Sequence, residues 1–333
     1  MIVRIGIVGC GAIALDMHAP AAVATAGLQL TAAIDSDLAL AHKLAAKFDI
    51  AEVGRSIREL GGVLNAVLIA TPPHTHVALA AEAFEAGLHV LCEKPMANTA
   101  AECDEMIRMA GAARRILAVG HNFRFFPVRR QLPQLVQEHE LGGIKSIVAT
   151  EGKPYTWPTR TGYTVRRDLV PGGVVLNAGI HTLDSILWWL GDPQEVHYED
   201  DAVGGLESNA RVELRFQDGQ SASFRQSRTC SLRYEIRVIA EHGEILLATN
   251  ATREYTVKTA AGSTTYRAPS QGADETDYAR AQLSDFVDSI RSSGQPLVPG
   301  SEGARVIRLI DQLYAIKRAR PLPRRAPIPG LTW

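Results

Sequence analysis

Short apolar runs alternate with longer helical patterns over about the first 120 residues. The apolar runs are rich in β-branched residues, as in IVRIGIVG, which is typical of strands buried on both faces. Predicted strands cover residues 2–9, 28–35, 65–71, 89–92 and 116–120. A predicted helix after the fourth run begins at Thr99, where Glu102 completes a capping box. Strands alternating with helices predict βαβ units and a parallel sheet.

The pattern changes after residue 122. Runs such as ARVELRF and YEIRVIA alternate apolar and polar positions between residues 194 and 268, with QDG and EHG as turns. This alternation predicts a mostly antiparallel sheet. Predicted helices cover residues 132–140, 173–190, 275–292 and 301–318, and a strand covers 144–151.

These elements predict an α/β protein with two domains, as expected for 333 residues. Residues 1–122 form a Rossmann domain with a doubly wound parallel sheet. Residues 123–318 form an α+β domain with a large, mostly antiparallel sheet. Residues 319–333 are a Pro-rich tail.

Composition narrows the function classes. The 35 basic and 36 acidic residues are balanced, so a nucleic acid or an anionic membrane is not an expected partner. Apolar stretches are interrupted well before membrane-spanning length, and no signal peptide is recognisable. The four cysteines form no CxxC pair, which favours reduced thiols of a cytoplasmic protein over a disulfide or zinc site.

A dinucleotide-binding turn follows the first strand. Gly9, Gly11 and Ala14 have the spacing GxGxxA and open a helix. Gly9 permits a tight turn, and Gly11 lets the backbone approach a pyrophosphate. The helix N-terminus at Ala12 and Ile13 supplies unpaired N–H groups to it.

The second strand ends in an acid, Asp35, as this fingerprint requires. Its carboxylate accepts hydrogen bonds from the ribose hydroxyls and repels a 2′-phosphate. No arginine follows it closely in sequence, so NAD is expected rather than NADP. The competing interpretation of Asp35 is a turn residue or helix cap.

The segment ATPPHTH…VLCEKPMANT, behind this turn, strongly resembles the Gfo/Idh/MocA family, which includes glucose-fructose oxidoreductase and inositol dehydrogenase. GHNFRF (120–125), PGGVVLNAGIHTLD (171–184) and the last helical stretch extend the resemblance over nearly the whole chain. The resemblance implies a sugar or polyol oxidoreductase in which the domain at 123–318 serves substrate binding and oligomerisation. It also implies a homo-oligomer, a dimer or tetramer, because the family's large sheet commonly packs against a partner subunit.

By this resemblance Glu93, Lys94 and Pro95 are the family's EKP motif, and Lys94 reaches the nicotinamide and the reacting oxygen. A lysine just beyond a strand end can stabilise a developing alkoxide; alone it would be interpreted as a solvated loop residue. The resemblance places four more residues along the cofactor: Thr71, Pro72, His76 and Asn122. His74 and His76 invite a metal interpretation, but spacing suggests no third ligand.

His181 is, by resemblance, the catalytic histidine. Imidazole is the usual group for taking an alcohol proton near neutral pH. Asn177, His181 and Asp184 have the spacing of one helical face. Many members have an aspartate where this chain has Asn177, which can position a hydroxyl but cannot titrate. Asp184 either orients the imidazole or has a structural role.

Aromatic and basic residues precede this helix and are candidates for substrate selection, although a surface or interface loop is an equal alternative. An acidic or nucleotide-linked sugar would suit them. The candidates are Tyr155, Trp157, Arg160, Tyr163, Arg166, Arg167 and, elsewhere, Arg124.

The sequence thus predicts an NAD-dependent oxidoreductase that transfers a hydride at a secondary alcohol or ketone of a sugar, sugar derivative or polyol. Two alternatives stay open. One is a non-catalytic NAD- or sugar-binding regulatory member of the same fold. The other is a non-sugar reductase of the dihydrodiol or tetrapyrrole type.

Overall fold

The structure is a computed structural model that describes residues 1–154, 162–202, 205–269 and 278–319. The described residues form two compact units. Met1–Phe125 and Asp274–Ile307 supply the first, and Phe126–Ala273 and Arg308–Trp333 supply the second.

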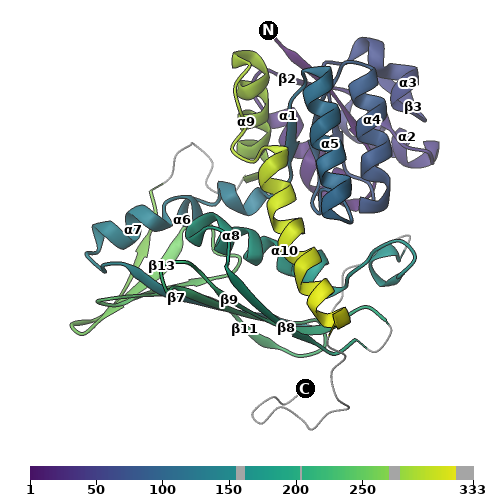
Figure 1. Cartoon of the computed structure of the whole chain (residues 1–333). Coiled ribbons are helices and arrows are strands. Elements are labelled where there is room, and N and C mark those ends of the chain that lie inside the picture. The colour runs from purple at the N-terminus through teal and green to yellow at the C-terminus, as the bar shows by residue number, and fades with distance from the viewer. Residues whose placement is uncertain (155–161, 203–204, 270–277, 320–333) are drawn as a thin grey trace. The chain divides into compact units, whose positions relative to one another are not determined.

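The first unit contains a six-stranded parallel sheet in the order β3-β2-β1-β4-β5-β6 (Figure 1). Its strands are β1 (Val3–Val8), β2 (Leu28–Ile34), β3 (Glu52–Gly54), β4 (Ala66–Ile69), β5 (His89–Cys92) and β6 (Leu117–Val119). The five predicted strands are confirmed. Strand β3 was missed because three residues are too few for a recognisable pattern. Chain order reverses between β1 and β4, where doubly wound sheets bind their ligands.

Helices connect these strands as predicted. They are α1 (Ala19–Ala24), α2 (Leu38–Phe48), α3 (Ile57–Leu60), α4 (His76–Glu85) and α5 (Ala100–Ala113). A π-helical turn, Ala14–His18, precedes α1. The capping box of α5 is confirmed, with the Thr99 hydroxyl accepting from the Glu102 N–H and the Glu102 carboxylate accepting from the Thr99 N–H.

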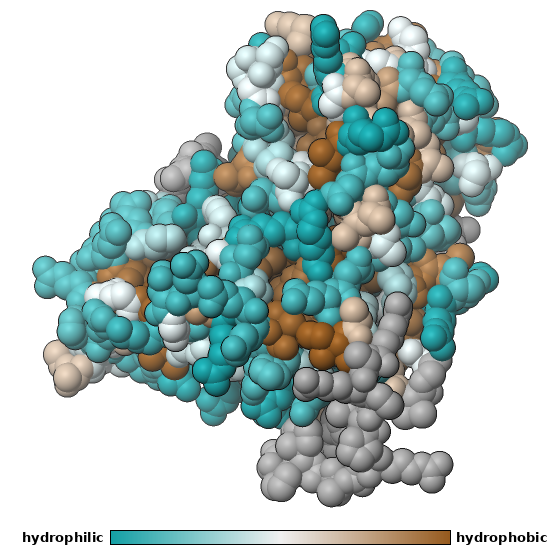
Figure 2. Space-filling view, in the orientation of Figure 1, coloured by the Kyte–Doolittle hydropathy of each residue, from teal (hydrophilic) through white to brown (hydrophobic). Residues whose placement is uncertain are grey.

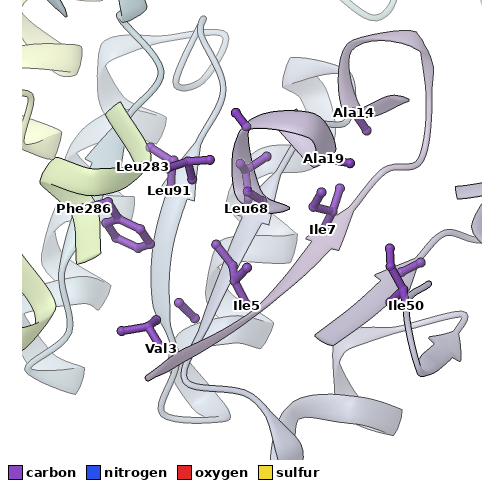
Figure 3. Close-up of a cluster of buried hydrophobic side chains, with 14 of the residues drawn as sticks. Val3, Ile5, Ile7, Ala14, Ala19, Ile50, Leu68, Leu91, Leu283 and Phe286 are labelled. Carbon is purple, nitrogen blue, oxygen red and sulfur yellow. The ribbon is translucent and has the colours of Figure 1, made fainter. Parts of the chain in front are cut away.

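Helix α9 (Tyr278–Ser292) returns to the first unit from late in the chain. Its Leu283 and Phe286 are buried in one cluster with side chains of β1, β4 and β5 (Figure 3). Its Gln282 amide also donates to the Val119 carbonyl at 3.3 Å. The sequence-based boundary, which assigned residues 123–318 to a second domain, therefore differs from the structure. The apolar stripe of α9 covers this sheet, and no local pattern could reveal that.

The second unit contains an eight-stranded sheet in the order β14-β13-β12-β11-β7-β10-β9-β8. All neighbours are antiparallel except β7 and β10, which are parallel. The strands are β7 (Ile144–Gly152), β8 (Glu195–Asp200), β9 (Asn209–Arg215), β10 (Ser221–Ser227), β11 (Leu232–Ala240), β12 (Glu244–Ala248), β13 (Glu254–Thr259) and β14 (Gly262–Arg267). The predicted mostly antiparallel sheet is confirmed.

Helices lie along one face of this sheet (Figure 1). They are α6 (Pro127–Arg130), α7 (Leu132–Glu138) and α8 (Ile180–Leu190), which follows a π-helical turn, Val175–Gly179. Helix α10 (Gly300–Ala319) begins in the first unit and ends in the second.

The visible surface is largely hydrophilic, with small hydrophobic areas between (Figure 2). Within the described ranges, no helix combines the length and the apolar character that crossing a membrane requires.

Candidate functional site

The turn after β1 has the geometry that a pyrophosphate needs. Gly9 has φ +92°, and a Cβ there would lie 2.7 Å from the Thr71 methyl group and 2.8 Å from the Ala70 carbonyl oxygen. A Cβ on Gly11 would have nothing within 4 Å. Gly9 is therefore required by close packing, whereas Gly11 leaves open space before the helix N-terminus at Ala12. This is a cradle that a bound pyrophosphate fits.

Asp35 is fixed beside this turn by two backbone donors. Its Oδ2 accepts from the Cys10 N–H at 2.8 Å, and its Oδ1 accepts from the Asp37 N–H at 2.9 Å. The side chain stays partly exposed. Each carboxylate oxygen has a second lone pair, so both can still accept from ribose hydroxyls. The predicted NAD-binding residues Gly9, Gly11 and Asp35 are thus brought together.

An arginine lies near Asp35, although none follows it in sequence. Arg55, at the end of β3, donates from Nη1 to the Ser36 carbonyl oxygen at 2.8 Å. The pairing of β2 with β3 places it there. Recognising β3 in the sequence would have located Arg55 beside Asp35. Its three residues are too few to show a strand pattern.

His76 joins two loops of the first unit. Its Nε2 lies 2.8 Å from the Thr71 carbonyl oxygen, and its Nδ1 lies 3.0 Å from that of Pro95 and 3.1 Å from that of Met96. The ring is 1% exposed, and burial lowers its pKa despite these carbonyl partners. This placement argues against the predicted cofactor contact. Thr71 and Pro72 remain partly exposed.

Glu93 and Lys94 lie directly beyond β5, before a cis Lys94–Pro95 peptide. Glu93 Oε1 lies 2.9 Å from His18 Nε2, and its Oε2 accepts from the Lys94 N–H at 2.9 Å. Burial raises the pKa of Glu93, but the hydrogen bond and charge of His18, together with the charge and N–H of Lys94, outweigh it, so this pKa is lowered. Burial lowers the pKa of Lys94, and the Glu93 charge partly offsets that effect.

Asn122 and Arg124 follow β6 in a 3-10 turn. Asn122 is 8% exposed, and its Nδ2 contacts the Met17 sulfur at 3.9 Å. Arg124 is buried and forms an ion pair with Glu302 of α10 at 2.9 Å. Its charge is compensated within the first unit, which favours a structural role over the predicted substrate contact.

In the second unit, Glu207 holds the start of the helix that carries His181. Its Oε2 accepts from the Gly173 N–H at 2.7 Å, and its Oε1 accepts from the Val175 N–H at 3.1 Å and the Tyr314 hydroxyl at 2.7 Å. These amides are the orphan donors of a helix N-terminus. Burial raises the pKa of Glu207, partly offset by the Tyr314 hydrogen bond. The sequence analysis identified neither Glu207 as the acceptor nor Tyr314 as a donor to it.

The glycine pair before this helix is explained by the same contacts. A Cβ on Gly172 would lie 2.0 Å from the Tyr314 hydroxyl oxygen, and one on Gly173 would lie 2.1 Å from the Glu207 carbonyl oxygen. A Cβ on Gly179 would lie 2.1 Å from Gln226 Oε1 of β10. Close packing against backbone therefore requires glycine at 173, whereas at 172 and 179 a Cβ would meet the end of a side chain.

The predicted helical face is only partly confirmed. Asn177 and His181 are both partly exposed, but Asp184 is 1% exposed. The π-helical turn Val175–Gly179 changes the angular spacing in this segment. Burial lowers the pKa of Arg129 to about 10, although the charges of Glu151 and Asp184 partly offset that effect. A structural role is thus favoured for Asp184 over substrate binding.

Buried polar side chains join α8 to the sheet and to α6. Thr182 donates to Glu151 of β7, and Ser185 accepts from Arg129. Gln226 of β10 also donates to Glu151 at 3.3 Å. These contacts fix the helix on the sheet.

Three of the predicted substrate contacts, Tyr155, Trp157 and Arg160, lie outside the described residues. Arg166 is exposed and forms an ion pair with Asp168 at 2.6 Å. Tyr163 is partly exposed and Arg167 is exposed.

Comparison with known proteins covers both units. Residues 3–121 match the model of an oxidoreductase family with an NAD-binding Rossmann fold, and residues 129–246 match the Gfo/Idh/MocA C-terminal domain. The chain is 26% identical to inositol 2-dehydrogenase of Rhizobium meliloti over 93% of this chain and 96% of that protein.

Two solved structures have the same fold. Aldose-aldose oxidoreductase from Caulobacter crescentus, complexed with glycerol, has a TM-score of 0.86 at 22% identity, covering 96% of this chain and 98% of that one. Levoglucosan dehydrogenase, in complex with NADH and levoglucosan, has a TM-score of 0.85 at 20% identity, with the same coverage.

Proposed function

Because the chain belongs to the Gfo/Idh/MocA family of NAD-binding oxidoreductases, we propose that it oxidises a secondary alcohol of a sugar, sugar derivative or polyol, or reduces the matching ketone. Lys94 and His181 handle the proton. NAD, held by the turn at Gly9–Gly11 and by Asp35, supplies or accepts the hydride when bound.

The observation that carries this proposal is the setting of Lys94. It lies at the carboxyl end of β5, where doubly wound sheets bind ligands, and its backbone is fixed by the Glu93 carboxylate. Its ammonium can stabilise the oxygen that becomes negative as the hydroxyl loses its proton or, in the reverse direction, as hydride reaches the carbonyl carbon. The lowered pKa of Lys94 also makes it a better proton donor to that oxygen.

His181 takes the hydroxyl proton in the oxidation direction. Its helix is fixed at the N-terminus by Glu207 and beneath by Glu151 and Arg129. A group held in this way keeps its geometry through the reaction. Asn177 precedes His181 by four residues and can hold a second substrate hydroxyl as donor and acceptor.

Charged residues before the His181 helix bear on which sugars the site accepts. The relatives named above act on inositol or carry levoglucosan or glycerol. The exposed Arg166 and Arg167 lie in the segment before the His181 helix. The Arg166 charge is already compensated by Asp168, and Arg167 is the residue that favours an acidic or nucleotide-linked sugar within this class.

A substrate panel with NAD and NADP tests this function. The panel contains inositols, neutral pyranoses, uronic acids and nucleotide sugars, and nicotinamide absorbance is read. We expect NAD reduction with one class and a loss of at least about 100-fold in kcat/KM for Lys94→Ala and His181→Ala. The exposed Lys43→Ala and His242→Ala are matched controls. NAD binding without turnover of any substrate would instead indicate a regulatory member of the fold.

We further propose that a second copy of the chain covers the sheet face opposite α6–α8. That face carries the half-buried apolar residues Val148, Ile239 and Leu246. Arg237 on this face is paired with Glu244 at 2.6 Å, so burial leaves that charge compensated. Light scattering on the wild type and on Leu246→Glu tests this; a monomeric wild type contradicts it.

A cytoplasmic location is also proposed. All four cysteines are free thiols, as a reducing compartment maintains. Fractionation of the native cells tests this.

A further inference from the structure

His18 is a buried imidazole that the proposed chemistry does not use. It ends the π-helical turn Ala14–His18, which follows the dinucleotide-binding glycines, and is 2% exposed. Its Nε2 lies 2.9 Å from Glu93 Oε1. Two segments 75 residues apart in sequence meet in this pair. π-helical turns inside helices often mark functional positions.

Hydrogen bonds hold the N–H and both carboxylate oxygens of Glu93. Its N–H donates to the Ile69 carbonyl oxygen of β4 at 2.9 Å, and its Oε2 accepts from the Lys94 N–H at 2.9 Å. A Cβ on Gly120 would lie 3.1 Å from both Cα and Cδ of Glu93, so the chain packs against it there. With Oε1 on His18, the carboxylate has one orientation.

We propose that His18 is a positioning residue for Lys94. Through Glu93 it links the helix whose N-terminus receives the cofactor pyrophosphate to the turn that carries Lys94. This inference rests on the proposed function of Lys94 and concerns the contacts that hold Lys94 in position.

The linkage has a geometric part and an electrostatic part. Geometrically, His18 fixes one carboxylate oxygen, and the other oxygen then fixes the Lys94 backbone. Electrostatically, the negative charge of Glu93 favours the ammonium form of Lys94. The titratable groups that act on Glu93 are His18 and Lys94, and Glu93 acts in turn on buried His76. Without the His18 contact, the carboxylate is free to rotate away from Lys94.

Two substitutions of similar polarity separate positioning from packing. In His18→Gln, the amide Nε2 is as far along the side chain as the imidazole Nε2, so it can still donate to Glu93. In His18→Asn the amide is too short to reach. We expect His18→Asn to lower kcat by about tenfold with substrate KM changed less than about twofold, because the lost interaction acts in the transition state. We expect His18→Gln to restore kcat to within about threefold of the wild type.

The electrostatic part is measured without substrate. Lysine ¹³Cε chemical shifts, assigned with Lys94→Arg, give the Lys94 pKa by NMR titration. We expect His18→Asn and Glu93→Gln to lower this pKa, and His18→Gln to leave it near the wild-type value. NAD affinity, measured by titration calorimetry, shows whether each variant keeps the dinucleotide turn intact.

Two results would overturn the proposal. One is equal kcat values and equal Lys94 pKa values for His18→Gln and His18→Asn. The other is a lowered Tm of His18→Asn with kcat and Lys94 pKa unchanged, which indicates packing alone. If the wild type turns over no substrate, the proposed function fails, but the NMR titration still decides whether His18 and Lys94 are linked.

Discussion

The dinucleotide-binding turn and the start of the His181 helix are both glycine-rich entries into a helix, but they are built differently. At Gly11 the space beside the backbone is open, and the groups presented are backbone amides. At Gly173 the same space is filled by the Glu207 carbonyl. One glycine therefore leaves room for a ligand, whereas the other leaves room for the protein itself.

The contacts that hold the dinucleotide-binding turn and the His181 helix in place also differ. Asp35 is fixed by N–H groups of the turn and of its own loop. The His181 helix is fixed by Glu207 and Tyr314, which lie 34 and 107 residues away from the groups they bind. A site built from local backbone is readable as a motif, but a site built from distant side chains is not.

A methyl group added at each glycine tests whether the space beside it is filled by the protein or left open for a ligand. Gly173→Ala forces a Cβ to within 2.1 Å of the Glu207 carbonyl oxygen. We expect it to destabilise the second unit by about 3 kcal/mol or more, as overpacking of backbone against backbone does. Chemical denaturation followed by circular dichroism measures this.

Gly11→Ala is the matched variant. We expect an unchanged unfolding midpoint and an NAD affinity reduced by about tenfold, because the methyl group occupies space that the pyrophosphate needs. Equal stability losses in the two variants would remove the distinction between the sites.

A second prediction concerns cofactor choice at the first site. Asp35→Ser removes the charge that repels a 2′-phosphate, while Arg55 remains on the Ser36 carbonyl beside it. We expect the preference for NAD over NADP to fall by roughly 100-fold, since a charge-assisted contact replaces a repulsion. NADH and NADPH fluorescence titrations measure both affinities.

Adding Arg55→Ala to Asp35→Ser provides the control. We expect the gained NADPH affinity to fall by about tenfold while NADH affinity stays within twofold. If NADPH affinity is unaffected, Arg55 does not reach the 2′-position.

A third prediction tests the support of the second site. Glu207→Gln leaves one oxygen for two amide donors, so one buried N–H loses its acceptor. We expect a loss of about 1–3 kcal/mol in unfolding free energy, and about 1 kcal/mol for Tyr314→Phe, which removes only a donor. A double variant measured by urea denaturation should lose less than the sum, because the two side chains share one contact.

The smallest expected effect is an acid sensitivity in the first unit. His89 Nδ1 accepts from the Ile116 N–H at 3.0 Å, which the protonated ring cannot do. Burial, with the nearby Arg115 charge, lowers the pKa of His89 to about 4. Below pH 6.5 the unfolded chain binds the proton more readily, so stability is lost as pH falls from 6.5 to about 4.

Because His89 is half-buried, we expect this loss to be about 1 kcal/mol. His89→Asn, whose amide Oδ1 is as far along the side chain as Nδ1 and can still accept from Ile116, should flatten the pH dependence of Tm in that range. A pH dependence that stays unchanged would assign the acid sensitivity to other groups.

The sequence alone was enough to predict those elements of the protein that a local pattern of residues encodes. β-Branched runs gave the strands of the parallel sheet, period-2 alternation gave the large antiparallel one, and GxGxxA with Asp35 gave the cofactor turn. In each case the signal is a periodicity or a spacing within a short stretch of chain, so it can be recognised without knowing which distant segment the element pairs with.

Tertiary structure decided the rest. It packed α9 on the first sheet, tied His76 and Arg124 into buried contacts, and placed Arg55 beside Ser36. It also brought Glu207 and Tyr314 to the start of the His181 helix and His18 to Glu93. Each of these contacts joins segments whose pairing depends on the whole fold. A local pattern records which residues are polar, but only the fold decides which partner each one meets.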